Sequence, residues 1–194
     1  VERTSSTSVT ITLSATDKDG VNQILNTNGT SSTGGTTFNL AGAAGYNAAA
    51  PSDADLTGNA ITVSNVSAPT ITSATYDYST NQLVVTGIGF VSKSGATNDI
   101  DASTLTLTGD GGTTYTLSAS SDVEIDSTTQ FTITLTGAHI VNVESILNKD
   151  GTNSAVSNTV YNLAAADNWA TGAPSATDIA DTTSNGITVS NYAA

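Results

Sequence analysis

The sequence predicts an all-β fold made of repeated units, and three observations support this prediction. Thr, Val and Ile, which favour strands, are frequent, as are the turn-forming residues Asn, Gly, Asp and Ser. Short runs alternate apolar residues with Thr, as in Phe-Thr-Ile-Thr-Leu at residues 131–135, which is typical of a strand with one buried face. One block of sequence also occurs twice, in the same order.

The repeated block spans most of residues 9–65 and returns at residues 131–191. It begins with Val-Thr-Ile-Thr-Leu or Phe-Thr-Ile-Thr-Leu and ends with Asn-Ala-Ile-Thr-Val-Ser-Asn or Asn-Gly-Ile-Thr-Val-Ser-Asn. The matching segments between these ends are 21–26 with 143–148, 29–30 with 151–152, 38–41 with 161–164, Tyr46 with Trp169, and 51–52 with 174–175. The offset of about 122 to 126 residues predicts that residues 1–66 are the C-terminal half of a preceding repeat and residues 67–194 one complete repeat.

Strands are expected in the complete repeat at 70–76, 82–86, 104–108, 113–117, 123–125, 131–135, 160–163 and 187–190. Gly-Asp-Gly-Gly at residues 109–112 and Ser-Thr-Asn at residues 79–81 predict two tight turns between these strands. The preceding half repeat is expected to contain strands at 9–13, 36–40 and 61–66, each with an apolar face. The strands that would cover those faces belong to the other half of a repeat.

Short helical turns are expected in the loops. Val21, Ile24 and Leu25 follow the i, i+3, i+4 spacing of a helix face, and residues 143, 146 and 147 repeat that spacing. The Ala-rich stretches 41–50 and 164–170 are further candidates for a turn of helix. Seven or so strands at this spacing favour an immunoglobulin-like antiparallel β-sandwich repeat with short helical turns in its loops.

The charge balance excludes some partners. The chain has 17 acidic residues against four basic ones and a formal net charge of −13, whereas nucleic-acid binding needs clustered Lys and Arg. No apolar run is long enough for a transmembrane helix, so we expect no direct membrane insertion. The chain has no Cys, which excludes disulfides and thiolate metal sites and favours a bacterial origin. Because it begins at Val1 without Met, we expect a mature or excised piece.

One family resemblance covers residues 68–135. Pro-Thr-Ile-Thr-Ser-Ala-Thr at 69–75, followed by Leu-Val-Val-Thr-Gly-Ile-Gly-Phe at 83–90, resembles the opening of IPT/TIG-type immunoglobulin-like domains, and residues 126–135 resemble a later strand of that family. Residues 136–184 depart from the pattern. The whole unit is similar to repeats of large bacterial cell-surface proteins of the adhesin or surface-layer type. The resemblance implies an extracellular, structural or adhesive role and carries over no catalytic residues.

The sequence offers little for catalysis. His139 is the only histidine, and Asp17 stands at the corresponding position of the other copy, so the two copies share no catalytic triad. No glycine-rich phosphate loop leads from a strand into a long helix. We therefore expect that the protein is not an enzyme.

Calcium is the one cofactor that the sequence suggests. The candidate ligands are Asp17, Asp19, Asp99 and Asp101, which lie in pairs two residues apart in predicted turns, where carboxylates suit a hard cation. The alternative is that Asp17 or Asp19 caps the helical turn that follows. A further pair, Asp53 and Asp55, aligns with Ala176 and Asp178, so only one acid of that pair is shared between the copies.

Three classes of function follow. The first is a structural repeat that serves as a spacer, an adhesin stalk or part of a surface-layer lattice, with neighbouring repeats as its partners. The second is a subunit of an extracellular fibre, in which identical chains complete the half repeat by interchain strand exchange. The third is an adhesin module that binds surface glycans or host proteins.

Overall fold

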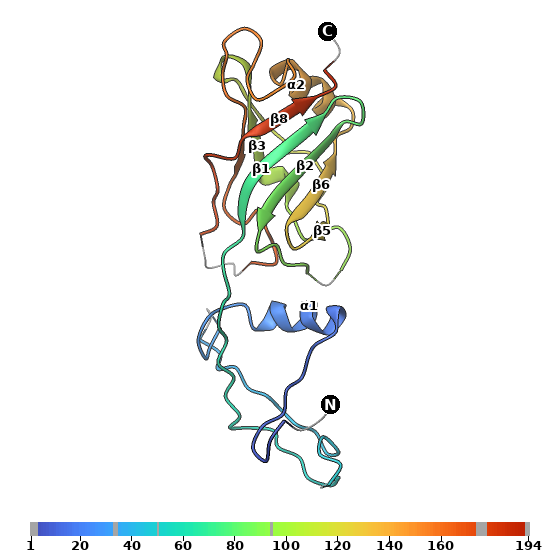
Figure 1. Cartoon of the computed structure of the whole chain (residues 1–194), viewed down its shortest axis with the longest axis vertical. Helices are drawn as coiled ribbons and strands as arrows, with labels where there is room; N and C mark the ends of the chain where they lie inside the picture. The colour runs from blue at the N-terminus through green and yellow to red at the C-terminus, as the bar shows by residue number, and fades with distance from the viewer. Residues whose placement is uncertain (1–3, 33–34, 50, 94, 174–177, 193–194) are drawn as a thin grey trace.

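The computed structural model describes residues 4–32, 35–49, 51–93, 95–173 and 178–192. Its elements in chain order are α1 (Ala15–Ile24), β1 (Thr70–Asp77), β2 (Gln82–Ile88), the 3-10 turn η1 (Ala102–Thr104), β3 (Leu105–Thr108), η2 (Asp110–Gly112), β4 (Thr114–Thr116), β5 (Ile125–Ser127), β6 (Gln130–Thr134), α2 (Ala138–Ile146), β7 (Asn162–Ala165) and β8 (Ile187–Ser190). The strands gather at one end of the elongated molecule, and residues 4–66 with α1 form the other end (Figure 1).

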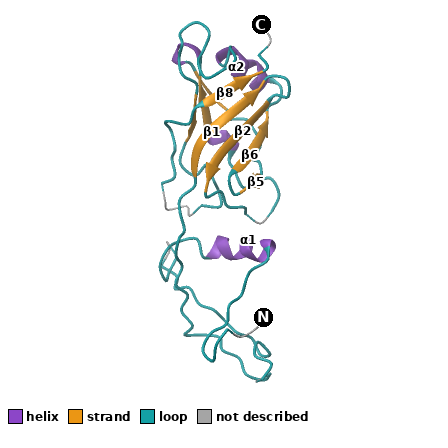
Figure 2. Cartoon of the chain, viewed as in Figure 1, coloured by secondary structure: helices purple, strands orange, loops and turns teal. Residues whose placement is uncertain are grey.

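The strands form two sheets, as the predicted β-rich fold requires. One sheet has the order β5-β6-β2-β1-β8 and the other the order β4-β3-β7. All pairs are antiparallel except β1 with β8, which run parallel. The helices are short and lie outside the sheets (Figure 2). The structure thus confirms a β-rich fold with antiparallel pairing predominant.

A single hydrophobic core lies between the two sheets. Alternation places Leu83 and Val85 of β2 on the same buried face, and Leu105 and Leu107 of β3 meet them from the other sheet. Trp169 is fully buried in this core, and its indole N–H donates to the Ile179 carbonyl at 2.8 Å. The indole therefore combines a large apolar contact with a satisfied donor.

Both predicted tight turns join antiparallel strands. Residues 79–81 connect β1 to β2, where Asp77 Oδ1 accepts from the Ser79 N–H and hydroxyl, each at 2.7 Å, and Asn81 takes a left-handed φ of 57°. Residues 109–112 connect β3 to β4, and Gly111 has φ of 65°. Glycine and asparagine tolerate this conformation at least cost, which explains the composition of the turns.

The helices differ from the prediction in two ways. Helices α1 and α2 begin before the predicted turns at 21–25 and 143–147, because Ser14 caps α1 and Gly137, with φ of 55°, precedes α2. The prediction of helical turns in the Ala-rich stretches is wrong for the described residues, since 41–49 contain turns and an isolated bridge and Ala164 lies in β7. Pairing of β7 with β3 outweighs the helical preference of alanine there.

The described residues of the half repeat form no sheet. The strands predicted at 9–13, 36–40 and 61–66 contain only isolated bridges, such as Asn39 with Ala60 and Gly29 with Val63. The physical reason is visible in the complete repeat, where β6 pairs with β2 and β5, β7 with β3, and β8 with β1. The main partners, β1, β2 and β3, belong to residues 70–108, for which residues 4–66 contain no counterpart.

A matched pair of substitutions tests this difference between the copies. Ile133 is buried in β6, whereas Ile11, at the same position of the repeated block, is exposed. We expect Ile133→Ala to lower the free energy of unfolding by about 2–5 kcal/mol and Ile11→Ala by less than about 1 kcal/mol. Urea unfolding followed by the fluorescence of the single Trp measures the complete repeat. Equal losses in the two variants would contradict this account of the core.

Candidate functional site: the uncovered face of the half repeat

The half repeat, residues 4–66, keeps the local hydrogen bonds of residues 126–192. In each copy, for example, two backbone bonds join a glycine to a valine, at 2.9 and 2.8 Å. The recurring donor-to-acceptor backbone pairs are Gly29→Val63 with Gly151→Val189, Phe38→Thr30 with Tyr161→Thr152, Leu40→Asn59 with Leu163→Asn185, Gly42→Asp55 with Ala165→Asp181, and Leu25→Val21 with Leu147→Val143. The two copies therefore have the same backbone course where they correspond.

An asparagine at the end of the block organises a loop in both copies. Asn185 donates to Asp181 Oδ1 at 2.8 Å, and its own N–H donates to Asn162 Oδ1 at 3.1 Å. Asn59 makes the same bonds, to Asp55 Oδ1 at 2.9 Å and from its N–H to Asn39 Oδ1 at 2.9 Å. Asp55 therefore corresponds to Asp181. The sequence alignment had paired Asp55 with Asp178 because the loop before Asp181 is longer than the loop before Asp55.

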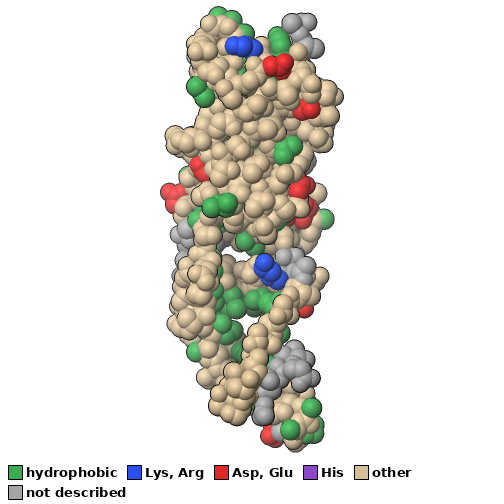
Figure 3. Space-filling view, viewed as in Figure 1, with side chains coloured by type: hydrophobic (Ala, Val, Ile, Leu, Met, Phe, Trp, Pro, Cys, Tyr) green, Lys and Arg blue, Asp and Glu red, His purple; other side chains and the backbone are tan. Residues whose placement is uncertain are grey.

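Several apolar side chains of the half repeat are exposed where their counterparts are buried, whereas Phe38 is buried like its counterpart Tyr161. Ile11 is 58% exposed against 3% for Ile133, and Leu40 is 61% exposed against 0% for Leu163. Ile24 of α1 is 66% exposed, against 5% for Ile146 of α2. Figure 3 shows hydrophobic side chains gathered on the lower part of the molecule, beside and below α1. Exposed apolar surface of this kind is typical of an interaction site.

Asp181 and Tyr78 make polar contacts between the two halves of the complete repeat, residues 67–125 and 126–192. Asp181 Oδ2 accepts from the Ile71 N–H of β1 at 2.8 Å. The Tyr78 hydroxyl lies 2.9 Å from the Glu144 carbonyl and 2.8 Å from the Leu147 carbonyl at the end of α2. Burial and the nearby Glu144 carboxylate raise the pKa of Tyr78, so the phenol stays a donor at neutral pH. These contacts tie β1 to the loop and the helix of the other half.

The half repeat has acceptors that correspond to the Asp181 carboxylate and to the carbonyls at the end of α2. It has no counterpart of the Ile71 and Tyr78 donors. Asp55 bonds Asn59 through one oxygen, and within the described residues no backbone N–H meets the other oxygen. The carbonyls of Asn22 and Leu25 match those of Glu144 and Leu147, and no tyrosine hydroxyl of the described chain bonds to them. The half repeat thus presents apolar surface together with acceptors that lack the donors found in the complete repeat.

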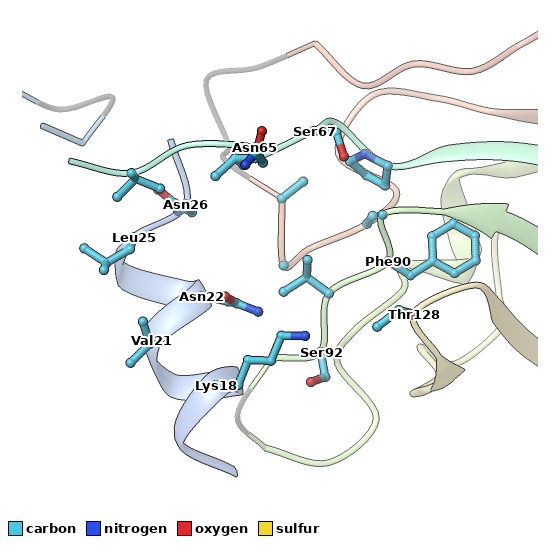
Figure 4. A pocket seen from close by; sticks show the side chains of 18 of the residues that line it. Lys18, Val21, Asn22, Leu25, Asn26, Asn65, Ser67, Phe90, Ser92 and Thr128 are labelled. Atoms are coloured by element: carbon cyan, nitrogen blue, oxygen red, sulfur yellow. The ribbon is translucent and has the colours of Figure 1, made fainter. Parts of the chain in front are cut away.

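A groove of about 620 Å³ separates α1 from the complete repeat. Lys18 and Asn22 point from α1 into the groove, and Phe90, Ser92 and Thr128 line its other wall (Figure 4). Val21 and Leu25 also belong to the lining, and their side chains extend from α1 on the side away from Phe90 (Figure 4). The wall that α1 contributes is therefore part polar and part apolar.

The described side chains among the predicted calcium ligands, those of Asp17, Asp99 and Asp101, accept hydrogen bonds from nearby donors. Ser14 Oγ accepts from the Asp17 N–H at 3.2 Å and donates to Asp17 Oδ2 at 2.7 Å, a reciprocal cap of α1. Asp19 lies in α1, and its side chain is outside the described part of the structure. Asp101 caps η1, accepting from the N–H and hydroxyl of Ser103 at 3.0 and 2.6 Å.

Asp99 is buried, and its carboxylate joins two segments of the chain by hydrogen bonds. Its Oδ2 accepts from the Ile125 N–H at 3.0 Å, and its Oδ1 accepts from the Lys93 N–H. Its carboxylate thus holds the loop after β2 against β5. Across the part of the chain that the structure describes, no three His, Cys, Asp or Glu side chains form a group suited to a metal ion.

The remaining polar candidates have separate places. His139 Nδ1 lies 2.9 Å from the Tyr115 hydroxyl, beside a cavity of about 370 Å³ whose lining includes Thr132 and Ser120. Asp53 lies exposed in a loop, and Asp178 accepts from the Ala180 N–H at 3.0 Å. The matched segment 174–175 lies outside the described residues.

Sequence reasoning missed Asp181 and Tyr78, which are among the residues that join the halves. The repeated Asn59 and Asn185 could have pointed to Asp55 and Asp181, because each acid stands four residues before its asparagine. Tyr78 has no such signal, since the half repeat has no counterpart of β1.

The fastening role of Asp181 is testable against its counterpart. Asp181→Ala leaves the Ile71 N–H and the Asn185 amide without their acceptor, and we expect a loss of about 1–3 kcal/mol in unfolding free energy. Asp55→Ala is the matched control, and we expect less than about 0.5 kcal/mol because Asp55 meets no strand. Thermal melts of both variants measure the difference, and comparable losses would contradict a fastening role.

The calcium prediction has a direct test. If the acidic loops bind calcium, excess EDTA lowers the melting temperature and added calcium restores it, because a ligand of the native state stabilises by mass action. Asp101→Asn, which removes a carboxylate, should abolish the calcium response while retaining a capping acceptor. An unchanged melting temperature in EDTA leaves capping and loop closure as the roles of these acids.

No helix among the described residues has the length and hydrophobicity to span a membrane. Comparisons of the chain with protein-family models, curated proteins and solved structures gave no match.

Proposed function

We propose that this chain is an extracellular structural repeat of a bacterial surface protein and serves as a spacer, an adhesin stalk or an element of a surface-layer lattice. The observation that carries the proposal is the recurrence of one hydrogen-bond pattern in two units. The units follow one another along the long axis of the molecule (Figure 1). Repeats stacked in this way extend in one direction, so length grows with repeat number.

The finer fold assignment supports the same role. We infer that the complete repeat is an immunoglobulin-like β-sandwich of the IPT/TIG type, with α2 inserted between β6 and β7. Its support is the face-to-face packing of a five-stranded and a three-stranded sheet over one core, together with the sequence resemblance at residues 68–135. Compact sandwiches joined by short connections are suited to building stalks.

The composition suits an exposed, oxidising location. The chain has neither Cys nor Met, the two residue types that oxidation alters most readily. Its net charge of −13 favours solubility and repels other copies. Both properties agree with a surface location.

Antibodies against this chain test the location in the source organism. We expect labelling of intact, unpermeabilised cells and loss of the labelled protein after brief protease treatment of their surface. Labelling that requires permeabilisation would contradict the proposal. A glycan array run with the purified chain separates the spacer from the adhesin module, since a spacer repeat gives no specific signal.

A further inference from the structure

We propose that residues 4–66 are a docking surface for one occupant: a half repeat of the same kind as residues 67–122, covalently joined ahead of the turn at residues 4–8. This inference rests on the proposed array of repeats and deepens it, because it names the partner of the exposed face. Four observations carry it.

The first observation is that the surface matches one already formed within this chain. In the complete repeat, β6, β7 and β8 pair with β2, β3 and β1. The half repeat has the same residue types at the facing positions: Ile11 for Ile133, Leu13 for Leu135, Leu40 for Leu163, Ile61 for Ile187 and Val63 for Val189. A surface with these side chains fits the inner face of strands equivalent to β1, β2 and β3.

The second observation is that the polar anchor points are in place. Asp55 offers the oxygen that, on Asp181, receives the Ile71 N–H. The end of α1 offers the carbonyls that, on α2, face the Tyr78 hydroxyl. An occupant needs an extended strand with a free N–H and a tyrosine a few residues later, which is what residues 70–78 supply.

The third observation concerns the route of the chain. In the complete repeat, β5 enters β6 through a turn in which the Thr129 N–H donates to Ser127 Oγ at 3.2 Å. The half repeat has the same turn, with the Thr7 N–H donating to Ser5 Oγ at 3.1 Å. Sequence agreement extends further back, since Val-Glu occurs at both 1–2 and 123–124. The turn therefore receives a strand of the β5 kind from its N-terminal side.

The fourth observation favours a covalently joined half over a second copy as the occupant. The chain has a formal net charge of −13, so separate copies repel one another. A covering half in the same polypeptide meets the surface without diffusion.

The test adds the proposed occupant to the full chain. A copy of residues 67–122 is placed directly before Val1, and hydrogen exchange is measured by NMR in the original and the extended chain. We expect the amides of Phe38, Leu40 and Val63 to exchange at least about tenfold more slowly in the extended chain, approaching the rates of Tyr161, Leu163 and Val189. The extended chain should remain a monomer in sedimentation.

Two variants of the extended chain keep the test specific. Asp substitutions in the added copy at the positions that correspond to Leu83 and Leu105 should remove the gain in protection while the original complete repeat stays folded. Asp55→Ala should accelerate exchange in the extended chain and leave the original chain unchanged.

Two outcomes would overturn the proposal. One is a folded, monomeric extended chain with no gain in protection of residues 9–65. The other is protection of those residues in the original chain that rises with protein concentration, which would make a second copy the occupant. Neither outcome bears on cell-surface labelling, so failure of this inference and failure of the extracellular role are separable.

Discussion

Strand pairing between the two halves of a repeat is the interaction on which the rest of this structure depends. β6, β7 and β8 find their main ladder partners in β1, β2 and β3, which all come earlier in the chain. One half can therefore form turns, bridges and a capped helix, but it cannot close a core. The contrast between Ile133 and Ile11, the same residue at the same repeat position, shows how completely burial depends on the missing sheet.

The magnitudes explain why the half repeat keeps its course without that burial. Its loops are held by local backbone bonds such as the two between Gly29 and Val63, each of which contributes about 0.5–1.5 kcal/mol. A buried Ile or Leu contributes about 1.5–3 kcal/mol relative to an exposed one. Ile11, Leu40 and Ile24 are all exposed. Their burial against a partner would therefore add more free energy than the local bonds supply.

The sequence predicted the elements that depend on local pattern. The alternation at residues 131–135 and the Gly-rich turn at 109–112 identify strands and a hairpin because side-chain period and backbone conformation are encoded locally. It failed at the Ala-rich stretches 41–50 and 164–170. In the second stretch alanine favours helix, but pairing with β3 decides, as the pairing of Ala165 with Leu105 shows.

The candidate site was less accessible from the sequence. Asp17, Asp99 and Asp101 have the residue type of calcium ligands and equally that of caps, and only their donors, such as the Ser103 N–H at Asp101, distinguish the two roles. The role of Asp181 depends on a contact with Ile71, 110 residues away, and the loop before it differs in length from its counterpart. Such a contact cannot be found from spacing within either copy.

An exposed apolar face with open strand edges is a liability for any extracellular protein, because it can pair with any other exposed strand. In an array of half repeats this liability disappears at every internal position, since each uncovered half follows directly on the half that fits it. The polar anchors add selectivity, because a wrong partner that covers Ile11 and Leu40 would still leave Asp55 and the α1 carbonyls without donors. The acidic surface opposes contact between separate copies, so in the proposed array the covalent order of the halves, and not diffusion, would determine which faces meet.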